Sequence, residues 1–295
     1  MQMREKPAAL QYPSGWSSGL SFGVVGVCNH DGKQQGLAMT DAASQPVALV
    51  TGAARRIGRA IALALAGRGY HIAVHYRSSK DEAMALVAEI EAKGQRAAAV
   101  PADLANMTDV ATLVPRAAAA VGPLTCLINN ASEFHQDTVD TLTPQTWTTH
   151  HDINFKTPVF LAQALFHGLP AGAKGNVINI IDQRVLQLTP EFFSYTLSKA
   201  GLWTATRTMA QAMAPRVRVN AIGPGPILRS IHQSDADFAA EQASTLLGRG
   251  ASPQEIAAGV GFILDAPAMT GQMIALDGGQ HLSRGLSLGF QGTGN

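Results

Sequence analysis

From residue 46 onward, short runs rich in valine, isoleucine and leucine alternate with alanine-rich stretches of helical length. This alternation is typical of a parallel sheet with helices on both faces, because each parallel connection needs a crossover. The predicted strands cover residues 47–51, 71–76, 97–101, 124–128, 176–181, 216–220 and 272–276. Seven strands in this order predict an α/β fold with one doubly wound parallel sheet in a single domain.

Local signals for helix starts agree with this alternation. The pairs Ser79 with Glu82 and Ser252 with Glu255 have the spacing of a capping box, and Thr143 precedes a proline. These signals predict that helices begin directly after each of the three capping residues.

The two ends of the chain have a different composition. Residues 1–45 show no periodicity and are rich in polar residues and glycine, so we expect a flexible leader before a domain that covers residues 46–282. Met39 suggests the hypothesis that translation starts there. The short apolar stretch at 19–28 has no small-x-small cleavage site, so no signal peptide is expected. The glycine-rich tail at 283–295 is predicted to be loose.

Composition narrows the class of partner. Apolar residues make up 46% of the chain and charged residues 15%, which is below the roughly 25% of common soluble domains and favours extensive burial. A net charge of +1 provides no basic face for nucleic acid, so a small molecule is the expected partner. No apolar run reaches the ~18 residues of a membrane span. Cys28 and Cys126 are expected to be free thiols in the cytoplasm, and the histidines lack the spacing of metal ligands.

The first predicted strand leads directly into a glycine-containing turn. The turn reads Thr51-Gly52-Ala53-Ala54-Arg55-Arg56-Ile57-Gly58, and a helical stretch follows it. Such a turn directs backbone N–H groups and the positive end of a helix at a pyrophosphate, as in a Rossmann-type dinucleotide site. An ordinary strand-to-helix turn explains the same pattern, with Gly52 providing only a positive φ.

The second predicted strand ends in a sequence that distinguishes two cofactors. It reads His75-Tyr76-Arg77-Ser78 and contains no carboxylate for the ribose 2′-hydroxyl of NAD. Arg77 and Ser78, helped by Arg55, are expected to hold a 2′-phosphate, so NADPH is favoured over NADH. The alternative is that Arg77 is solvated and that Ser78 only precedes a helix cap.

Tyr195 and Lys199 lie four residues apart in a predicted helix, so their side chains share a face. An ammonium beside a phenol is expected to lower the phenol pKa from its usual value near 10, which would make Tyr195 a usable proton donor and acceptor. A tyrosine and lysine exposed on any helix surface would show the same spacing.

The motifs together resemble the short-chain dehydrogenase/reductase family across residues 46–282. They are the Thr51 turn, Asn129-Asn130-Ala131-Ser132, Asn154, Tyr195 with Lys199, Pro224-Gly225 and Asp277-Gly278-Gly279, in the family's order. The resemblance implies hydride-transfer chemistry in a homo-oligomer, either a dimer or a tetramer. The resemblance also implies roles for single residues: Tyr195 is the proton donor, and Lys199 is both a ribose ligand and the group that modifies the pKa of Tyr195. Asn154 anchors a water relay. Asp103 and Leu104 lie beside the adenine, and the residues around the rest of the cofactor are Asn130, Ala131, Pro224 and Gly225.

Two residues depart from the common family pattern. Arg56 stands where most members have a glycine, and its cation must point toward the pyrophosphate or the substrate. Asp182 stands where a catalytic serine normally donates a hydrogen bond to a substrate carbonyl. An ionised carboxylate only accepts hydrogen bonds, so Asp182 disfavours ketone reduction and favours reduction of a C=N bond. The alternative is that Asp182 caps the turn that follows it.

Both departures resemble the pteridine reductase and dihydromonapterin reductase branch of the family. This resemblance implies that Phe134 stacks on a pterin, with Ser132 and Arg56 near its polar edge. Burial of Phe134 in the core is the alternative. The predicted function is therefore NADPH-dependent reduction of a dihydropterin, with a 3-oxoacyl or other carbonyl reductase and an NADPH-binding regulatory protein as alternatives. A substrate loop is expected at 226–237, and His150 and His151 are expected to be solvated helix residues.

Overall fold

The structure is a computed structural model that describes residues 45–229 and 234–283. Most of the predicted leader, with Met39 and Cys28, and the tail beyond residue 283 lie outside the described residues. Seven parallel strands form one sheet in the order β3-β2-β1-β4-β5-β6-β7, which confirms the doubly wound sheet. The strands are β1 Val47–Val50, β2 His71–Tyr76, β3 Ala97–Pro101, β4 Cys126–Asn129, β5 Gly175–Ile180, β6 Val217–Pro224 and β7 Met273–Leu276.

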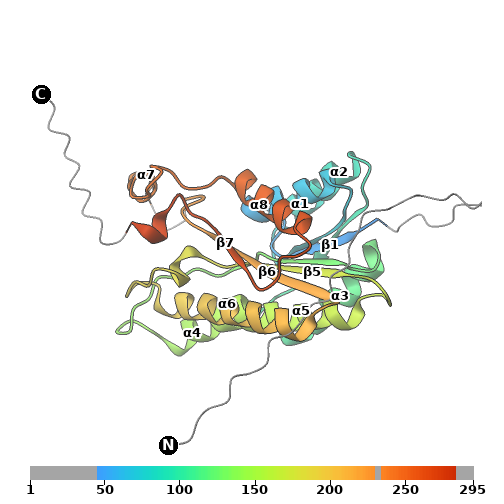
Figure 1. The fold of residues 1–295 in the computed structure, drawn as a ribbon, viewed down its shortest axis with the longest axis horizontal. Coiled ribbons are helices and arrows are strands. Elements are labelled where there is room, and N and C mark those ends of the chain that lie inside the picture. Colours follow the sequence, from blue (N-terminus) through green and yellow to red (C-terminus); the bar gives the residue numbers. More distant parts are fainter. Residues whose placement is uncertain (1–44, 230–233, 284–295) are drawn as a thin grey trace, which may run out of the picture. The chain divides into compact units, whose positions relative to one another are not determined.

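Helices cover both faces of this sheet (Figure 1). On one face lie α1 Arg56–Gly67, α2 Lys80–Glu91 and α8 Pro253–Asp265. On the other lie α3 Met107–Val121, α4 Pro144–His151, α5 Thr157–Gly168 and α6 Phe193–Met213. The remaining elements are η1 Asp152–Lys156, η2 Gln183–Val185, α7 Asp235–Ala243 and η3 Gln280–Leu282.

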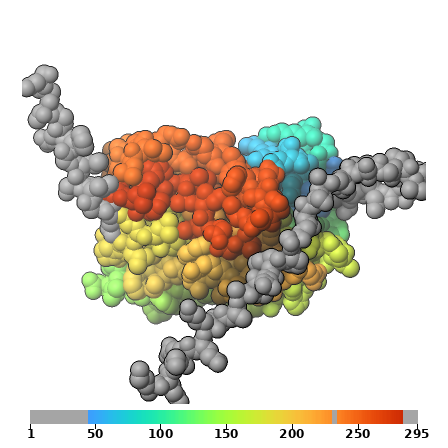
Figure 2. Space-filling model, viewed as in Figure 1, coloured from blue at the N-terminus to red at the C-terminus, as the bar shows by residue number. Residues whose placement is uncertain are grey.

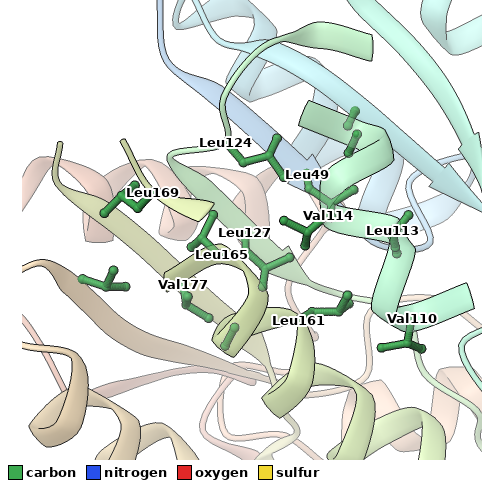
Figure 3. Packing of buried hydrophobic residues seen from close by; sticks show 14 of the residues in the cluster. Leu49, Val110, Leu113, Val114, Leu124, Leu127, Leu161, Leu165, Leu169 and Val177 are labelled. Atoms are coloured by element: carbon green, nitrogen blue, oxygen red, sulfur yellow. The ribbon is translucent and has the colours of Figure 1, made fainter. Parts of the chain in front are cut away.

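The core consists of two apolar layers because successive strand residues point to opposite faces. In β1, Leu49 packs with the layer under α3 and α5, whereas Val50 packs with the layer under α1, α2 and α8. Figure 3 shows the first layer, in which Leu127 and Leu165 lie between the sheet and the helices. Cys126 is fully buried in β4 as a free thiol. The buried strands hold the carboxyl ends of β1 and β4 side by side, where the strand order reverses.

Helices begin directly after all three predicted capping residues, at Lys80, Pro144 and Pro253, and two of the three caps are made. Ser252 accepts from the backbone N–H of Glu255 at 3.2 Å in a complete capping box, and Thr143 accepts from the N–H of Thr146 at 3.1 Å. The capping box at Ser79 is wrong, because the Ser79 side chain makes no capping hydrogen bond. Its expected partner Glu82 pairs instead with Arg55, at 3.5 Å.

Two further differences from the sequence prediction affect the site. Strand β6 continues four residues beyond its predicted end at 220 and reaches Pro224, because it pairs with β7 as far as Leu276. The helix predicted to begin after Thr143 ends at His151 and is followed by the π-helical turn η1, which contains Asn154. Within the described part of the chain, no helix is long and apolar enough to cross a membrane.

Candidate active site

Two adjacent cavities open at the carboxyl edge of the sheet. The loop cavity, of about 350 Å³, is bordered by the turn after β1 and the ends of β2, β3 and β4. The tyrosine cavity, of about 270 Å³, is bordered by the ends of β5 and β6 and the start of α6. In Figure 2 the segments from α7 to η3, in orange to red, lie beside the yellow segment that leads into α6, and both segments contribute to the tyrosine cavity.

The predicted site residues divide between these cavities. The loop cavity is lined by Gly52, Arg55, Arg56, Ile57, Gly58, His75, Tyr76, Arg77, Ser78, Asp103, Leu104, Asn130, Ala131 and Ser132. The tyrosine cavity is lined by Arg56, Ser132, Phe134, Asp182, Tyr195, Lys199, Pro224 and Gly225. Thr51 and Asn154 border neither cavity and instead support the walls. Arg56, Ile57, Asn130 and Ser132 border both, so the two cavities meet along these residues.

The turn after β1 is held tightly against the end of β4. Gly52 has a φ of +62°, which favours glycine. A Cβ added to Gly58 would lie 2.3 Å from the Gly52 carbonyl oxygen, so helix α1 approaches the turn as closely as glycine allows. The Thr51 hydroxyl accepts from the N–H groups of Asn130 and Ala131 at 2.9 and 3.0 Å. The turn therefore has a fixed shape before any ligand is bound.

His75 supports the same turn from β2. The Gly52 N–H donates to His75 Nδ1 at 2.9 Å, and Nε2 lies 3.2 Å from the Ala102 carbonyl oxygen. This arrangement requires the neutral tautomer with its proton on Nε2. Burial lowers the pKa of His75 to about 4, which keeps the imidazole neutral.

The start of α1 can receive an anion. Its first turn, which the structure describes in full, contains no acidic residue, and its N-cap residue Arg55 makes no side-chain capping bond. The first N–H groups of the helix therefore face the loop cavity without a capping side chain. Arg56 has a φ of 55°, and its guanidinium donates to the carbonyl oxygens of Leu228 and Arg229 at 3.0 and 3.1 Å. The sequence left open whether this cation points to the pyrophosphate or to the substrate, and in the structure it points to the segment after β6, where the substrate loop is expected.

Arg77 reaches across the loop cavity to an acidic residue. Its Nη1 lies 2.7 Å from the Glu133 carboxylate, and both residues line the cavity. The Arg77 side chain remains 57% exposed, so a phosphate entering the cavity can compete with Glu133 for the guanidinium.

Asp182 and Tyr195 meet in the tyrosine cavity. The Tyr195 hydroxyl donates to Asp182 Oδ2 at 2.9 Å. The other oxygen, Oδ1, accepts from the Arg184 N–H at 2.8 Å, so Asp182 also caps η2, which is the alternative that the sequence left open. Lys199 Nζ donates to the Ile180 carbonyl oxygen at 3.0 Å. Lys199 and Tyr195 share a face of α6 as predicted, and both are buried.

The expected lowering of the Tyr195 pKa is wrong, because other groups outweigh Lys199. Burial, and next the Asp182 carboxylate, raise the pKa of Tyr195 well above 10. Burial lowers the pKa of Lys199 to about 8, against the opposing effect of Asp182. Burial also raises the pKa of Asp182. The ammonium is already bonded to a main-chain carbonyl, whereas the carboxylate contacts the phenol directly, so Tyr195 keeps its proton in this arrangement.

Asn154 holds the segment after β4. Its Oδ1 accepts from the Ser132 hydroxyl at 3.0 Å and from the Glu133 N–H at 2.8 Å, and its Nδ2 donates to the Glu133 carbonyl oxygen at 2.9 Å. Asn154 is fully buried in the π-helical turn η1, which turns its amide toward Ser132. The water relay from Asn154 to Lys199 stays a prediction.

Aromatic side chains form one wall of the tyrosine cavity. The Phe134 ring stacks on Phe192 with centroids 4.4 Å apart, and its edge meets Tyr195 at 4.7 Å. Phe192 has a φ of 54°, and the Arg184 guanidinium lies 4.6 Å from the centroid of its ring. Phe192 and Arg184 could not be predicted from the sequence, because no motif marks them and only the turn between β5 and α6 brings them to Phe134.

The prediction that His150 is a solvated helix residue is wrong. His150 is fully buried, and its Nδ1 lies 2.7 Å from the Ser194 hydroxyl oxygen. Only one face of α4 contacts α6, and the short, polar sequence of α4 gives little sign of which face that is. His151, by contrast, stacks on Trp147 at 3.9 Å. Among residues 45–229 and 234–283, no group of histidine, cysteine and acidic side chains is arranged to hold a metal ion.

Comparisons with known proteins agree with this geometry. A family described as short chain dehydrogenase matches residues 46–239. The 3-oxoacyl-[acyl-carrier-protein] reductase of Staphylococcus aureus is 34% identical over 240 residues, which cover 80% of this chain and 98% of that protein. FolM alternative dihydrofolate reductase 1 from Brucella canis, solved with NADP, is 48% identical with a TM-score of 0.78, over 80% of this chain and 94% of that one. The angucycline C-6 ketoreductase LanV with bound NADP is 31% identical, with a TM-score of 0.75 over 80% and 96%.

Proposed function

Because this chain belongs to the short-chain dehydrogenase family, we propose that it is an NADPH-dependent reductase that converts a dihydropterin to the tetrahydro form. The observation that carries the proposal is the 2.9 Å hydrogen bond from Tyr195 to Asp182. This bond puts an acceptor where the common family pattern has a donor for a substrate carbonyl. The 48% identity to a dihydrofolate reductase solved with NADP supports the same choice.

The loop cavity fits the cofactor. The close approach of Gly58 to Gly52 and the uncapped start of α1 leave room and N–H donors for a pyrophosphate. Arg77 and Ser78 border the same cavity and would hold the 2′-phosphate. NADP bound to solved structures that are 31% and 48% identical supports this assignment. When bound, NADPH supplies the hydride that reduces the substrate carbon.

Side chains of the protein supply the proton that the substrate nitrogen receives. Tyr195 carries its proton at the hydroxyl oxygen, because its pKa is raised, and delivers it to the ring nitrogen of the C=N bond as hydride reaches the carbon. Asp182, hydrogen-bonded to that hydroxyl, orients it, and a proton that Asp182 takes from solvent passes along this hydrogen bond to the phenolate and restores the hydroxyl. Lys199, with its pKa lowered to about 8, adds a nearby positive charge that stabilises a transient phenolate.

The walls of the tyrosine cavity suit a flat heterocycle that carries N–H groups. Phe134 provides an aromatic surface. Gln183 and Asp182 also line this cavity and bring an amide and a carboxylate to its wall. Oxygen atoms of these groups accept hydrogen bonds from the N–H groups of a pterin, whereas a simple ketone has no N–H group to offer.

The test is a comparison of substrates with the purified protein. NADPH oxidation is followed at fixed enzyme concentration with dihydropterins, dihydrofolate, ketones and acyl thioesters. We expect turnover of at least one dihydropterin, with kcat/KM above that for any carbonyl compound. Turnover of ketones or 3-oxoacyl thioesters alone would overturn the proposal.

The second candidate is a carbonyl reductase. The 34% identity to a 3-oxoacyl-[acyl-carrier-protein] reductase favours it. This function requires Asp182 to carry a proton, because only a protonated carboxyl donates a hydrogen bond as a serine does, and burial raises the pKa of Asp182 in that direction. The third candidate function is that of an NADPH-binding regulatory protein, and the Tyr195→Phe variant distinguishes it from both enzymes. A regulator keeps its effect with phenylalanine, whereas a reductase loses turnover while it still binds NADPH.

We also propose a cytoplasmic homo-oligomer, either a dimer or a tetramer. The support is an apolar surface on the α4 and α5 side of the sheet, where Trp147 is 40% exposed and Phe160 is 44% exposed. Measurement of the molar mass by light scattering, as the protein elutes from a size-exclusion column, distinguishes the two assemblies from a monomer.

A further inference from the structure

Three buried polar side chains lie directly behind Tyr195, outside both cavities. Asp137 belongs to the segment between β4 and α4, His150 to α4 and Ser194 to the first turn of α6. Asp137 is 2% exposed, and the other two are fully buried. We call these three residues the Asp137 network. The proposed proton path does not use it, yet its burial is costly unless every polar group is paired.

The hydrogen bonds of the network run in one direction. The backbone N–H of His135 donates to His150 Nε2 at 3.0 Å, so this nitrogen is an acceptor. The proton of neutral His150 therefore lies on Nδ1, which donates to the Ser194 hydroxyl oxygen at 2.7 Å. Ser194 in turn donates its hydroxyl proton to the Asp137 carboxylate. Every donor in this chain thus has an acceptor, which fixes the tautomer of His150.

The residue types are those of a hydrolytic triad, but the order is not. In a triad the histidine lies between the acid and the serine, and the serine oxygen is accessible. Here Ser194 lies between Asp137 and His150 and is fully buried. No substrate can reach its oxygen, so the network has a different task.

Its position shows what it holds. Phe192, the N-cap residue of α6, makes no side-chain capping bond. Asp137 replaces that cap, because its backbone carbonyl accepts from the Phe193 N–H at 3.3 Å and its Oδ1 accepts from the Ser194 N–H at 3.2 Å. A carboxylate at this end of α6 also interacts favourably with the helix dipole. The next residue along the helix is Tyr195.

Two aromatic neighbours of Tyr195 belong to the segments that the network joins. The His150 ring meets the Tyr195 ring edge-on, with centroids 5.8 Å apart. Phe134, three residues before Asp137, meets it edge-on at 4.7 Å. Movement of α4 or of the segment after β4 would therefore move the surfaces against which the phenol rests.

We propose that Asp137, His150 and Ser194 are positioning residues that fix the Tyr195 phenol against Phe134 and Asp182, and that the proton-transfer step depends on this placement. The proposal rests on Tyr195 being the proton donor of the proposed function. It holds for a pterin and for a carbonyl substrate alike.

The test uses Ser194→Ala, His150→Ala and His150→Asn in the full chain. We expect kcat to fall about tenfold to a hundredfold in the two alanine variants, because a displacement on the order of 1 Å costs that much. KM for NADPH should stay within about twofold of wild type, because the network lies outside the loop cavity. His150→Asn keeps an N–H donor near the Nδ1 position, so it should retain more turnover than His150→Ala. It also provides a milder variant if an alanine variant does not fold.

A second readout needs no substrate. Phenolate absorbance is titrated in each variant, and the Tyr195→Phe trace made in the same background is subtracted to isolate Tyr195 among the four tyrosines. In wild type, Tyr195 should ionise only well above pH 10. Water reaches a Tyr195 ring that is held less firmly. In the Ser194→Ala variant the Tyr195 phenol should therefore ionise at a lower pH than in wild type, while circular dichroism still reports a folded chain.

The control is His151→Ala, which removes the neighbouring histidine of α4 that stacks on Trp147 outside the network. It should leave kcat and the Tyr195 titration at wild-type values. Wild-type kcat and titration in Ser194→Ala, or equal losses in His151→Ala, would overturn the positioning role. If wild type turns over no dihydropterin but Ser194→Ala still shifts the Tyr195 titration, the proposed function fails and the positioning role stands.

Discussion

At the scale of single residues, the chemistry of the site depends on how Asp182 uses its two oxygens. One accepts from the Tyr195 hydroxyl and the other from the Arg184 N–H. From the sequence alone the catalytic and the capping roles of Asp182 are alternatives, but a carboxylate has enough lone pairs for both. A serine has one oxygen and cannot hold both partners in this geometry. Asp182 therefore ties the phenol to the turn that follows β5.

Asp182→Ser tests whether this carboxylate selects the substrate. A hydroxyl can donate to a carbonyl oxygen, so kcat/KM for ketones relative to dihydropterins should rise at least about tenfold, the usual gain from one hydrogen bond to a reacting group. Steady-state kinetics with both substrates provides the measurement. Asp182→Asn keeps the shape and removes the charge, which separates loss of charge from gain of the hydroxyl. An unchanged ratio in the serine variant would show that Asp182 does not determine the substrate class.

Arg77→Ala tests the cofactor assignment. Loss of a charge-assisted contact with the 2′-phosphate should weaken NADPH binding about tenfold to a hundredfold and leave NADH binding unchanged. Fluorescence titration of the reduced cofactors measures both affinities. The control is Glu133→Gln, which releases Arg77 from its ion pair and should preserve or strengthen NADPH binding. Equal discrimination between the two cofactors in Arg77→Ala and wild type would refute the assignment.

At the scale of elements, the shape of the phosphate-binding turn is set by how closely α1 approaches it. Gly58→Ala puts a methyl group 2.3 Å from the Gly52 carbonyl oxygen and 2.6 Å from Asn130 Nδ2, so the turn must move. We expect a loss of stability of about 1–3 kcal/mol and at least about tenfold weaker NADPH binding. Urea unfolding and cofactor titration measure the two effects. Gly67→Ala, at the other end of α1, meets nothing within 4 Å and should leave both quantities nearly unchanged.

Patterns that depend on local physics predicted the elements well. The seven strands follow from runs of apolar residues, and the capping box at Ser252 follows from spacing alone. At Ser79 the same spacing predicted the start of α2 correctly but not the capping bond, because Glu82 pairs with Arg55 from the turn after β1. The π-helical turn at Asn154 had no local signal. Contacts made across elements decided these cases, and sequence spacing does not record such contacts.

The features of the candidate site also differ in whether the sequence could predict them. Motif residues such as Tyr195, Lys199 and Gly58 could be assigned to the site in advance, because their order along the chain matches a known family, and all three line one of the two cavities. The direction of the pKa shift of Tyr195 could not be predicted from the sequence, since it depends on burial and on which neighbour contacts the phenol. His150 was missed for a related reason, because its burial is decided by the packing of α4 against α6.

At the scale of the whole molecule, buried neutral histidines make stability depend on pH. The pKa of His75 is lowered by burial from 6.5 to about 4, so between these values the unfolded chain binds a proton that the folded chain does not. The free energy of unfolding must therefore fall as pH decreases from 6.5, and this contribution must level off below pH 4. For His75 the change amounts to about 3 kcal/mol. His150, with its pKa also lowered to about 4, adds to the effect in the same direction.

Urea unfolding at intervals between pH 7 and pH 4 measures this slope, and His75→Asn isolates one contributor. Asparagine offers an oxygen to the Gly52 N–H but has no proton to gain in this range, so its unfolding free energy should decline less steeply with falling pH than that of wild type. His167→Asn, which changes an exposed histidine at the end of α5, is the matched control and should keep the wild-type slope. A His75→Asn curve parallel to that of wild type would mean that His75 is protonated in the folded chain. The Gly52 N–H would then lack its acceptor, and the turn could not have the shape on which cofactor binding depends.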